Sequence, residues 1–165
     1  MQQNTITARN KGGLILFLTL VYAANWNSVR KELWAQTSSA FNAHWLQPMG
    51  VMGDFSVARF STEKIDGKSL SRHQLSDFNG CQDICNLQDI RSTGINWSWH
   101  INSDGSSRIP GRLDRIVCNQ TWIHILPQSS YANLPLSTSD HSPMLLNLSK
   151  EFSGAQSLSK FSTIG

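Results

Sequence analysis

A short apolar run near the N-terminus constrains the fold more than any other part of this sequence. Residues 14–21 read Leu-Ile-Leu-Phe-Leu-Thr-Leu-Val, and they lie between Gly12-Gly13 and Tyr22. The run is rich in β-branched and aromatic residues and begins after glycine, which favours a buried β-strand over residues 14–22. It is too short to span a bilayer, because a spanning helix needs about 20 apolar residues.

The same run also resembles the hydrophobic segment of a secretory signal peptide, and this alternative stays open. Arg9 and Lys11 precede the run, and Ala23-Ala24 would form a cleavage point. Three glycosylation sequons would suit a secreted protein; they begin at Asn96, Asn119 and Asn147. Free thiols suit a reducing compartment instead, so we expect a nuclear or cytoplasmic location rather than secretion.

Three cysteines, at positions 81, 85 and 118, are an odd number, which argues against a disulfide framework. Cys81 and Cys85 lie four residues apart and would share one face of a helix. A metal site there would need two more ligands, and no histidine is near them in sequence. Small buried thiols are therefore the favoured interpretation.

Helical and strand patterns alternate irregularly along the rest of the chain, which predicts an α+β layered sandwich of two β-sheets flanked by helices. Ser28 is a plausible N-cap for the first helix, and Pro110 is expected to shorten the strand that follows it. We expect helices at 28–45, 71–86 and around Trp122, a loop at 56–68, a turn at 102–106, and strands at 50–55, 95–100, 111–118, 131–136 and 144–148.

Composition favours one globular domain with a disordered tail. The chain has 165 residues, 39% of them hydrophobic, with six tryptophans, which is typical of a chain that forms a core. The net charge of +3 is weak attraction for a polyanion, and no block of like charges could act as a nucleic-acid arm. From residue 149 onward the sequence is serine-rich and unpatterned, so a disordered tail is expected over 149–165.

Four polar clusters stand where predicted strands end. They are Tyr22 with Asn25, Gly53-Asp54-Phe55-Ser56, Arg112-Leu113-Asp114-Arg115, and Ser139-Asp140-His141-Ser142-Pro143. Phosphodiester hydrolysis needs a group that orients or deprotonates water, a cation, and donors for the developing charge. Carboxylates, a carboxylate-oriented histidine and a tyrosine hydroxyl supply such parts. Taken singly, each cluster has an ordinary alternative as a turn former, a cap or an edge strand.

Together with Trp97-Ser98-Trp99, these clusters follow in the order of a known family. The chain resembles the endonuclease/exonuclease/phosphatase family, the fold of apurinic endonucleases and pancreatic deoxyribonuclease. The likeness is closest to the endonuclease domain of plant non-long-terminal-repeat (LINE-type) retrotransposons. It covers roughly residues 14–148 and leaves 1–13 as a leader outside the family pattern.

By that resemblance, five residues would be catalytic and the implied metal would be Mg²⁺. Asp54 would orient or deprotonate the attacking water. His141 would contact the scissile phosphate, and Asp114 would hold its imidazole. Asp140 would serve the metal site or a proton relay, so that Asp54 and Asp140 are the metal ligands left in this chain. Tyr22 would contact the phosphate oxygens.

Three further residues would bind the substrate, and two departures from the family pattern concern activity. Asn25 would contact phosphate, Trp99 would line the groove, and Ser56 stands where the family has asparagine. The family also has a metal-binding glutamate on an early strand. Nothing in residues 1–13 supplies it, and Glu32 and Glu63 stand in the wrong blocks, on a helix and in a loop.

The resemblance therefore implies a truncated metal-dependent phosphodiesterase domain that lacks its N-terminal strands and has little or no activity, a pseudoenzyme. Two alternatives stay open. One is an active Mg²⁺-dependent nuclease or phosphatase that another chain completes. The other is a non-catalytic remnant that binds nucleic acid. DNA is the expected partner, from the retrotransposon-like intervening segments, whereas no membrane and no protein partner is indicated.

Overall fold

The computed structural model describes residues 2–9, 12–63, 72–101, 109–135, 139–148 and 159–162. The turn expected at 102–106 lies outside them. No helix in the described part of the chain is both long and apolar enough to cross a membrane.

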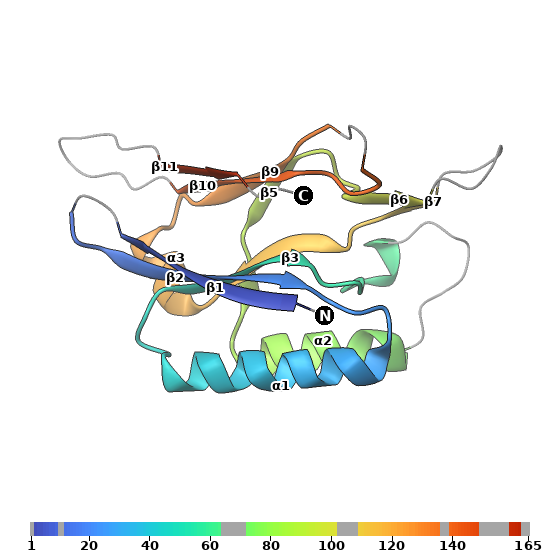
Figure 1. The fold of residues 1–165 in the computed structure, drawn as a ribbon, viewed down its shortest axis with the longest axis horizontal. Coiled ribbons are helices and arrows are strands. Elements are labelled where there is room, and N and C mark those ends of the chain that lie inside the picture. Colours follow the sequence, from blue (N-terminus) through green and yellow to red (C-terminus); the bar gives the residue numbers. More distant parts are fainter. Residues whose placement is uncertain are drawn as a thin grey trace.

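A five-stranded sheet forms the centre of the molecule, in the order β1-β2-β3-β8-β4 (Figure 1). Strand β2 pairs antiparallel with β1 and parallel with β3, and β3 pairs antiparallel with β8. The predicted internal strand at 14–22 is thus confirmed as β2, while the segment before it, where no element was predicted, forms β1. The strands are β1 Gln2–Arg9, β2 Ile15–Tyr22, β3 Met49–Asp54, β8 Asp114–Cys118 and β4 Gln88–Asp89.

A second, four-stranded sheet has the order β11-β10-β9-β5, and a separate ribbon pairs β6 with β7. Strand β11 falls within the tail that was expected to be disordered, and that expectation is wrong for its four residues. They pair with β10, whose edge offers unpaired backbone groups to another strand. The strands are β5 Arg91–Gly94, β6 Trp99–Ile101, β7 Ile109–Gly111, β9 Ser130–Asn133, β10 Met144–Leu148 and β11 Ser159–Ser162.

Two hydrophobic cores bind three layers together. Helices α1 (Asn27–Ala43) and α2 (Arg72–Ile84) cover one face of the five-stranded sheet, and the second sheet packs on its other face (Figure 1). Side chains alternate along β2, so Leu16 and Leu18 enter the core between the sheets, whereas Val21 packs in the core under the helices. The predicted α+β layered sandwich of two sheets is confirmed.

Several predicted boundaries are wrong, for local reasons. The N-cap of α1 is Trp26, with no side-chain cap bond, so Ser28 is not the cap, and the helix ends at Ala43 rather than near residue 45. The strand predicted at 95–100 begins only at Trp99, because the Ser98 hydroxyl accepts hydrogen bonds from the backbone N–H groups of residues 113 and 114. Those bonds also separate β7, which contains Pro110, from β8.

Asn119, one of the three sequon residues, is buried as the N-cap of helix α3 (Gln120–Ile125). Its Oδ1 accepts hydrogen bonds from the backbone N–H groups of Trp122 and Met49, and its amide donates to the Gln47 carbonyl. The side chain therefore joins α3 to the start of β3, and it has a structural role here that does not depend on glycosylation.

A buried ion pair anchors the loop that follows β3. The guanidinium of Arg115 on β8 is fully buried and donates to Glu63 Oε2 at 2.7 Å, while Asp89 Oδ1 lies 3.6 Å from it. Glu63 ends the short 3-10 turn η1 (Ser61–Glu63) and also accepts from the backbone N–H groups of Arg59 and Phe60. The Arg115 guanidinium and these N–H donors lower the pKa of Glu63 against the opposing effect of burial.

Replacing Glu63 with alanine is expected to destabilise the fold by about 3–5 kcal/mol, because it leaves the Arg115 charge buried without its main partner. The measurement is the free energy of unfolding in urea. Glu32→Ala is the control: Glu32 is exposed on α1, and its loss should cost within about 0.5 kcal/mol. A Glu63→Ala variant as stable as the Glu32→Ala control would contradict the importance of this pair.

Candidate active site

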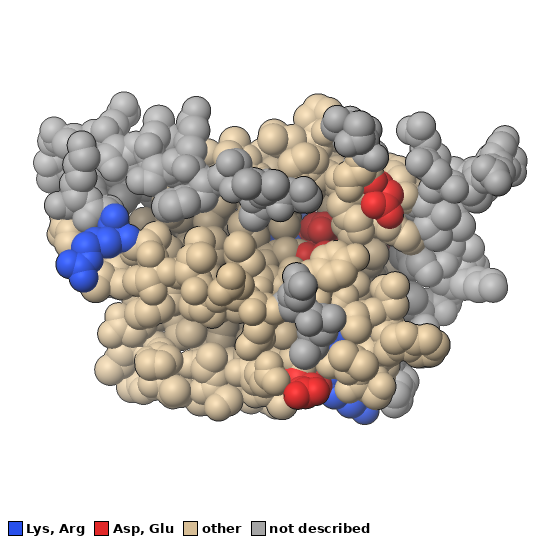
Figure 2. Space-filling view, viewed as in Figure 1, with Lys and Arg blue, Asp and Glu red and all other residues tan. Residues whose placement is uncertain are grey.

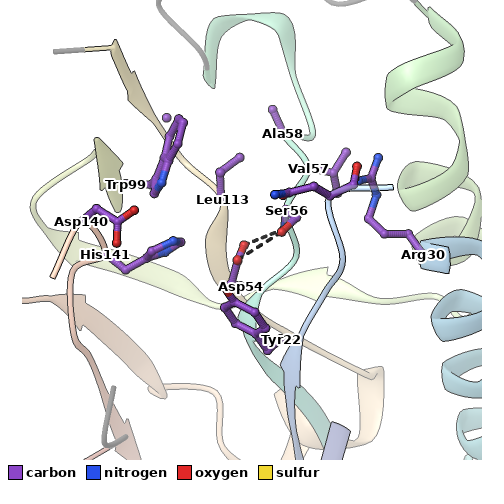
Figure 3. A pocket seen from close by; sticks show the side chains of 12 residues that line it. Tyr22, Arg30, Asp54, Ser56, Val57, Ala58, Trp99, Leu113, Asp140 and His141 are labelled. Atoms are coloured by element: carbon purple, nitrogen blue, oxygen red, sulfur yellow. Dashed lines mark hydrogen bonds between the residues drawn. The ribbon is translucent and has the colours of Figure 1, made fainter. Parts of the chain in front are cut away.

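A cavity of about 520 Å³ opens at the end of the five-stranded sheet where β2 and β3 finish and β8 begins (Figure 3). Because β2 and β3 are parallel, their carboxyl ends meet at one edge, and Tyr22 stands opposite Asp54 in the strand register. The cavity is lined by all of the predicted site residues except Asp114, namely Tyr22, Asn25, Asp54, Ser56, Trp99, Asp140 and His141.

Asp54 is the buried carboxylate at the end of β3. Its partner in the register across β3 and β8 is Asp114, so two carboxylates start from adjacent positions of the sheet. The residue before it, Gly53, has a φ of +141°, and a Cβ there would lie 2.0 Å from the Val21 carbonyl oxygen. Glycine is therefore required for β3 to approach β2 while delivering Asp54 to the cavity.

Ser56 holds the Asp54 carboxylate through two hydrogen bonds. Its backbone N–H donates to Asp54 Oδ1 at 2.6 Å, and its hydroxyl lies 3.1 Å from Oδ2 and 3.0 Å from the Ala23 carbonyl (Figure 3). Burial nevertheless raises the pKa of Asp54, and the nearby Asp114 adds to the rise. Ser56 has a φ of +48°, a left-handed conformation that asparagine tolerates well.

Asp114 and His141 make the contact expected from the sequence. His141 Nδ1 lies 3.0 Å from Asp114 Oδ2 and 3.2 Å from Oδ1. His141 belongs to the segment between β9 and β10 and bridges through its backbone to Trp99, whose ring lies 6.5 Å from the imidazole. The hydrogen bond to Asp114 raises the pKa of His141 against the effect of burial, and it leaves Nε2 as the ring nitrogen available to a substrate.

Three of these residues could hold a cation. Asp54, Asp114 and His141 each offer a ligand atom, and these atoms all lie within 4.8 Å of one another. Asp140, predicted as a ligand with Asp54, is exposed at the cavity and is not in this group. Carboxylate oxygens suit a hard divalent cation, so the donor set fits one, although Asp114 is already engaged with His141.

No glutamate lines the described part of this cavity. Glu63 is committed to Arg115, and Glu32 accepts a hydrogen bond from Gln36 on the exposed side of α1. Neither of these two side chains therefore lines the cavity. The cavity therefore offers two aspartates and one histidine beneath an open mouth.

Arg30 is a site residue whose role was not predicted from the sequence. It is buried on α1, lines the cavity, and donates through Nη1 to the carbonyls of Ala24 and Asn25 at 3.0 and 2.6 Å. These bonds fix the turn that carries Asn25 to the cavity. Its position on the helix, between Val29 and Lys31, gives no signal of this contact, which depends on how the chain turns after β2.

Charged side chains are sparse on the face shown in Figure 2, where lysines and arginines do not gather into a continuous patch among the described residues. This agrees with the net charge of +3. Attraction of a polyanion would depend on the few groups at the cavity itself rather than on a broad basic surface.

Comparison with solved structures shows the fold. The endonuclease domain of TRAS1, a telomere-specific non-LTR retrotransposon, matches 88% of this chain with a TM-score of 0.69 and 13% identity. D. rerio TDP2 complexed with single-strand DNA product matches 87% (TM-score 0.53, 14% identity), and an endonuclease/exonuclease/phosphatase protein from Bacteroides vulgatus matches 87% (0.50, 16%). This chain spans 63%, 60% and 53% of those three chains.

At the level of sequence, no protein-family model and no curated protein matches. The likeness is therefore one of architecture. The chain has the layered fold of the endonuclease/exonuclease/phosphatase structures, as the order of its motifs predicted.

The Asp114–His141 contact predicts a specific pH dependence. Because the pKa of His141 is raised in the folded state, the contact stabilises the fold fully below the ordinary histidine pKa of about 6.5. That stability is lost as the pH rises through the raised value. Asp114→Asn should lower the His141 pKa, as measured by NMR titration of the ring protons, with His141→Gln used for assignment. Asp140→Asn should lower it less, and equal shifts in the two variants would contradict the specific role of Asp114.

Proposed function

We propose that this chain provides a metal-dependent phosphodiesterase domain of the retrotransposon endonuclease type, with nucleic acid as its substrate and little activity of its own. The observation that carries the proposal is the cavity in which the Asp114-bound His141 faces Asp54. The proposed domain covers residues 14–148, and β1 extends its central sheet.

Asp54 and His141 have complementary protonation preferences for hydrolysis of a phosphodiester. Asp54 can accept a proton from water at the cavity floor, because burial makes it a stronger base than an ordinary aspartate. His141, whose protonated form Asp114 stabilises, can donate through Nε2 to a phosphoryl oxygen as negative charge develops there. Tyr22 and Asn25 also line the cavity, and their proposed role is to contact the neighbouring phosphate oxygens.

Mg²⁺ is the proposed cation. Asp54 would be its ligand from the clustered donors, and Asp140, which is outside that cluster, would be a second, exposed ligand from the cavity lining. When bound, the cation would neutralise charge on the phosphoryl oxygens. Proteins commonly bind this ion through one or two carboxylates together with substrate phosphate and several water molecules. Two carboxylates at the cavity where the phosphate would bind suit that pattern. No glutamate lines the cavity among the described residues. The proposed site therefore binds Mg²⁺ weakly.

Low activity of the isolated chain is proposed for two reasons. A glutamate ligand is absent from the described cavity lining, and Ser56 has a shorter side chain than the asparagine of the family pattern. The Ser56 hydroxyl is also occupied between Asp54 and the Ala23 carbonyl. Loss of one preorganised donor typically costs about a hundredfold in rate, and two losses within one constellation need not add.

DNA is the proposed substrate, supported by the retrotransposon-like motif order and by the fold shared with the TRAS1 endonuclease domain. Two alternatives remain distinct. A second chain could complete the site and give a working nuclease or phosphatase, or the domain could bind nucleic acid without cleaving it.

The experiment is nicking of supercoiled DNA by the purified chain with Mg²⁺. We expect slow nicking, which Ser56→Asn increases because a longer side chain can reach the water or phosphate. His141→Ala should abolish it, whereas the control His124→Ala, an exposed residue on α3, should not.

Two outcomes would overturn parts of this proposal. Robust cleavage by the unmodified chain that His141→Ala abolishes would overturn the low activity and establish a working enzyme. DNA binding without nicking by any variant, Ser56→Asn included, would leave the non-catalytic alternative in place of the phosphodiesterase.

A further inference from the structure

A pair of cysteines on α2 lies apart from the candidate active site and has no part in the proposed hydrolysis. Cys85 lines a second cavity, of about 510 Å³, which shares no lining residue with the active-site cavity. This second cavity lies where the ends of α1 and α2 meet the start of α3, with Phe41 and His124 among its walls.

The end of α2 places both thiols on one face. The Cys85 backbone N–H donates to the Cys81 carbonyl at 3.0 Å, so the helical turn continues across both residues. The helix then closes with bonds from Leu87 to Gln82 and from Asn86 to Asp83, and Asn86 has a φ of +49°. This is a Schellman motif, in which Asn86 takes the left-handed position.

Ser38 of α1 connects the two thiols. Its Oγ lies 3.2 Å from Cys85 Sγ and 3.6 Å from Cys81 Sγ. Both sulfurs therefore face α1 around one hydroxyl, and the two thiols are free. Side chains spaced i and i+4 are neighbours on a helix, and here a third group keeps them together.

The two thiols differ in access and in acidity. Cys81 is buried, whereas Cys85 is half-buried and opens to the cavity. Hydrogen bonds from Cys81 and Ser38 lower the pKa of Cys85 to about 6 against the effect of burial, while the contact with Cys85 and burial raise the pKa of Cys81. The partial negative charge of the helix C-terminus opposes the Cys85 thiolate, so the hydrogen bonds must outweigh it.

We propose that Cys85 is a site of oxidation by hydroperoxides and that Cys81 resolves the product as an intramolecular disulfide. The Cys85 thiolate attacks one oxygen of the peroxide, the O–O bond breaks, and the other oxygen takes a proton and leaves as an alcohol or water. Cys85 is then a sulfenic acid. The Cys81 sulfur attacks the Cys85 sulfur, its proton joins the departing hydroxyl, and water leaves as the S–S bond forms.

Closing this disulfide requires a small movement at the end of α2. Cβ atoms at i and i+4 lie about 5–6 Å apart, whereas a disulfide needs about 3.5–4.5 Å. The movement falls on the last turn of the helix, where Ile84 between the two cysteines is 72% exposed. Few packing contacts of Ile84 therefore resist it.

The test treats the reduced full chain with hydrogen peroxide and then counts free thiols after denaturation. We expect the count to fall from the three cysteines of the sequence to one, with a Cys81–Cys85 crosslink located by peptide mass mapping. Cys118, fully buried on β8 with its pKa raised by burial to about 12, is the internal control and should remain reduced.

Single substitutions separate the two roles. Cys81→Ser should stop the reaction at a Cys85 sulfenic acid that dimedone traps, whereas Cys85→Ser should retain both remaining thiols under the same peroxide. Ser38→Ala should slow oxidation, because it removes one donor to the thiolate. Three thiols after treatment, a Cys85 sulfinic acid without a crosslink, or a disulfide between two chains would each overturn the proposal.

Discussion

The fully buried guanidinium of Arg115 is the constraint around which this end of the molecule is organised. A charge that is removed from water must be compensated by opposite charges and hydrogen-bond acceptors of the protein. Glu63 and Asp89 meet it from the turn after β3 and from β4. Arg59 pairs in turn with Asp89, so loops distant in sequence are held against the central sheet by one group of ions.

The same group of ions reaches the second sheet. Arg112 lies beside Glu63 and donates to the Tyr131 hydroxyl and to Ser92, which belong to strands β9 and β5. Since Arg112 and Arg115 flank Asp114, the segment that supplies this carboxylate is held on both sides. Successive side chains of β8 point to opposite faces of the sheet. Arg115 therefore packs over Phe78 under the helices, while Asp114 points toward His141. Preorganisation of the site and stability of the fold thus have a common origin.

Both sheets contribute to the candidate active site, and this explains its place at the end of the sandwich. Asp54 and Asp114 come from adjacent strands of the central sheet. His141 comes from the segment that leads into β10 of the other sheet, and the Ser142 N–H donates to the Ser98 carbonyl at 2.7 Å beside it. The separation between carboxylates and imidazole therefore depends on how the two sheets pack, through the core that contains Met52, Ile116 and Met144.

The sequence by itself determined the elements whose side-chain patterns are strong. The apolar run became β2, the segment at residue 144 became β10, and the short strand expected at 50–55 became β3, which ends on Asp54. The order of the motifs also predicted that Asp114 would meet His141. Such features are local, or follow from a resemblance that already contains the fold. Only the tertiary structure decided on β1, β4, β5 and β11, because these mostly polar segments carry no strong apolar pattern and form strands through the partners with which they pair. It also decided that Glu63 is buried against Arg115 and that Arg30 donates a hydrogen bond to the Asn25 carbonyl in the turn before α1. A charged side chain reads as exposed in sequence, and only the packing of distant segments can supply the partner that allows it to be buried.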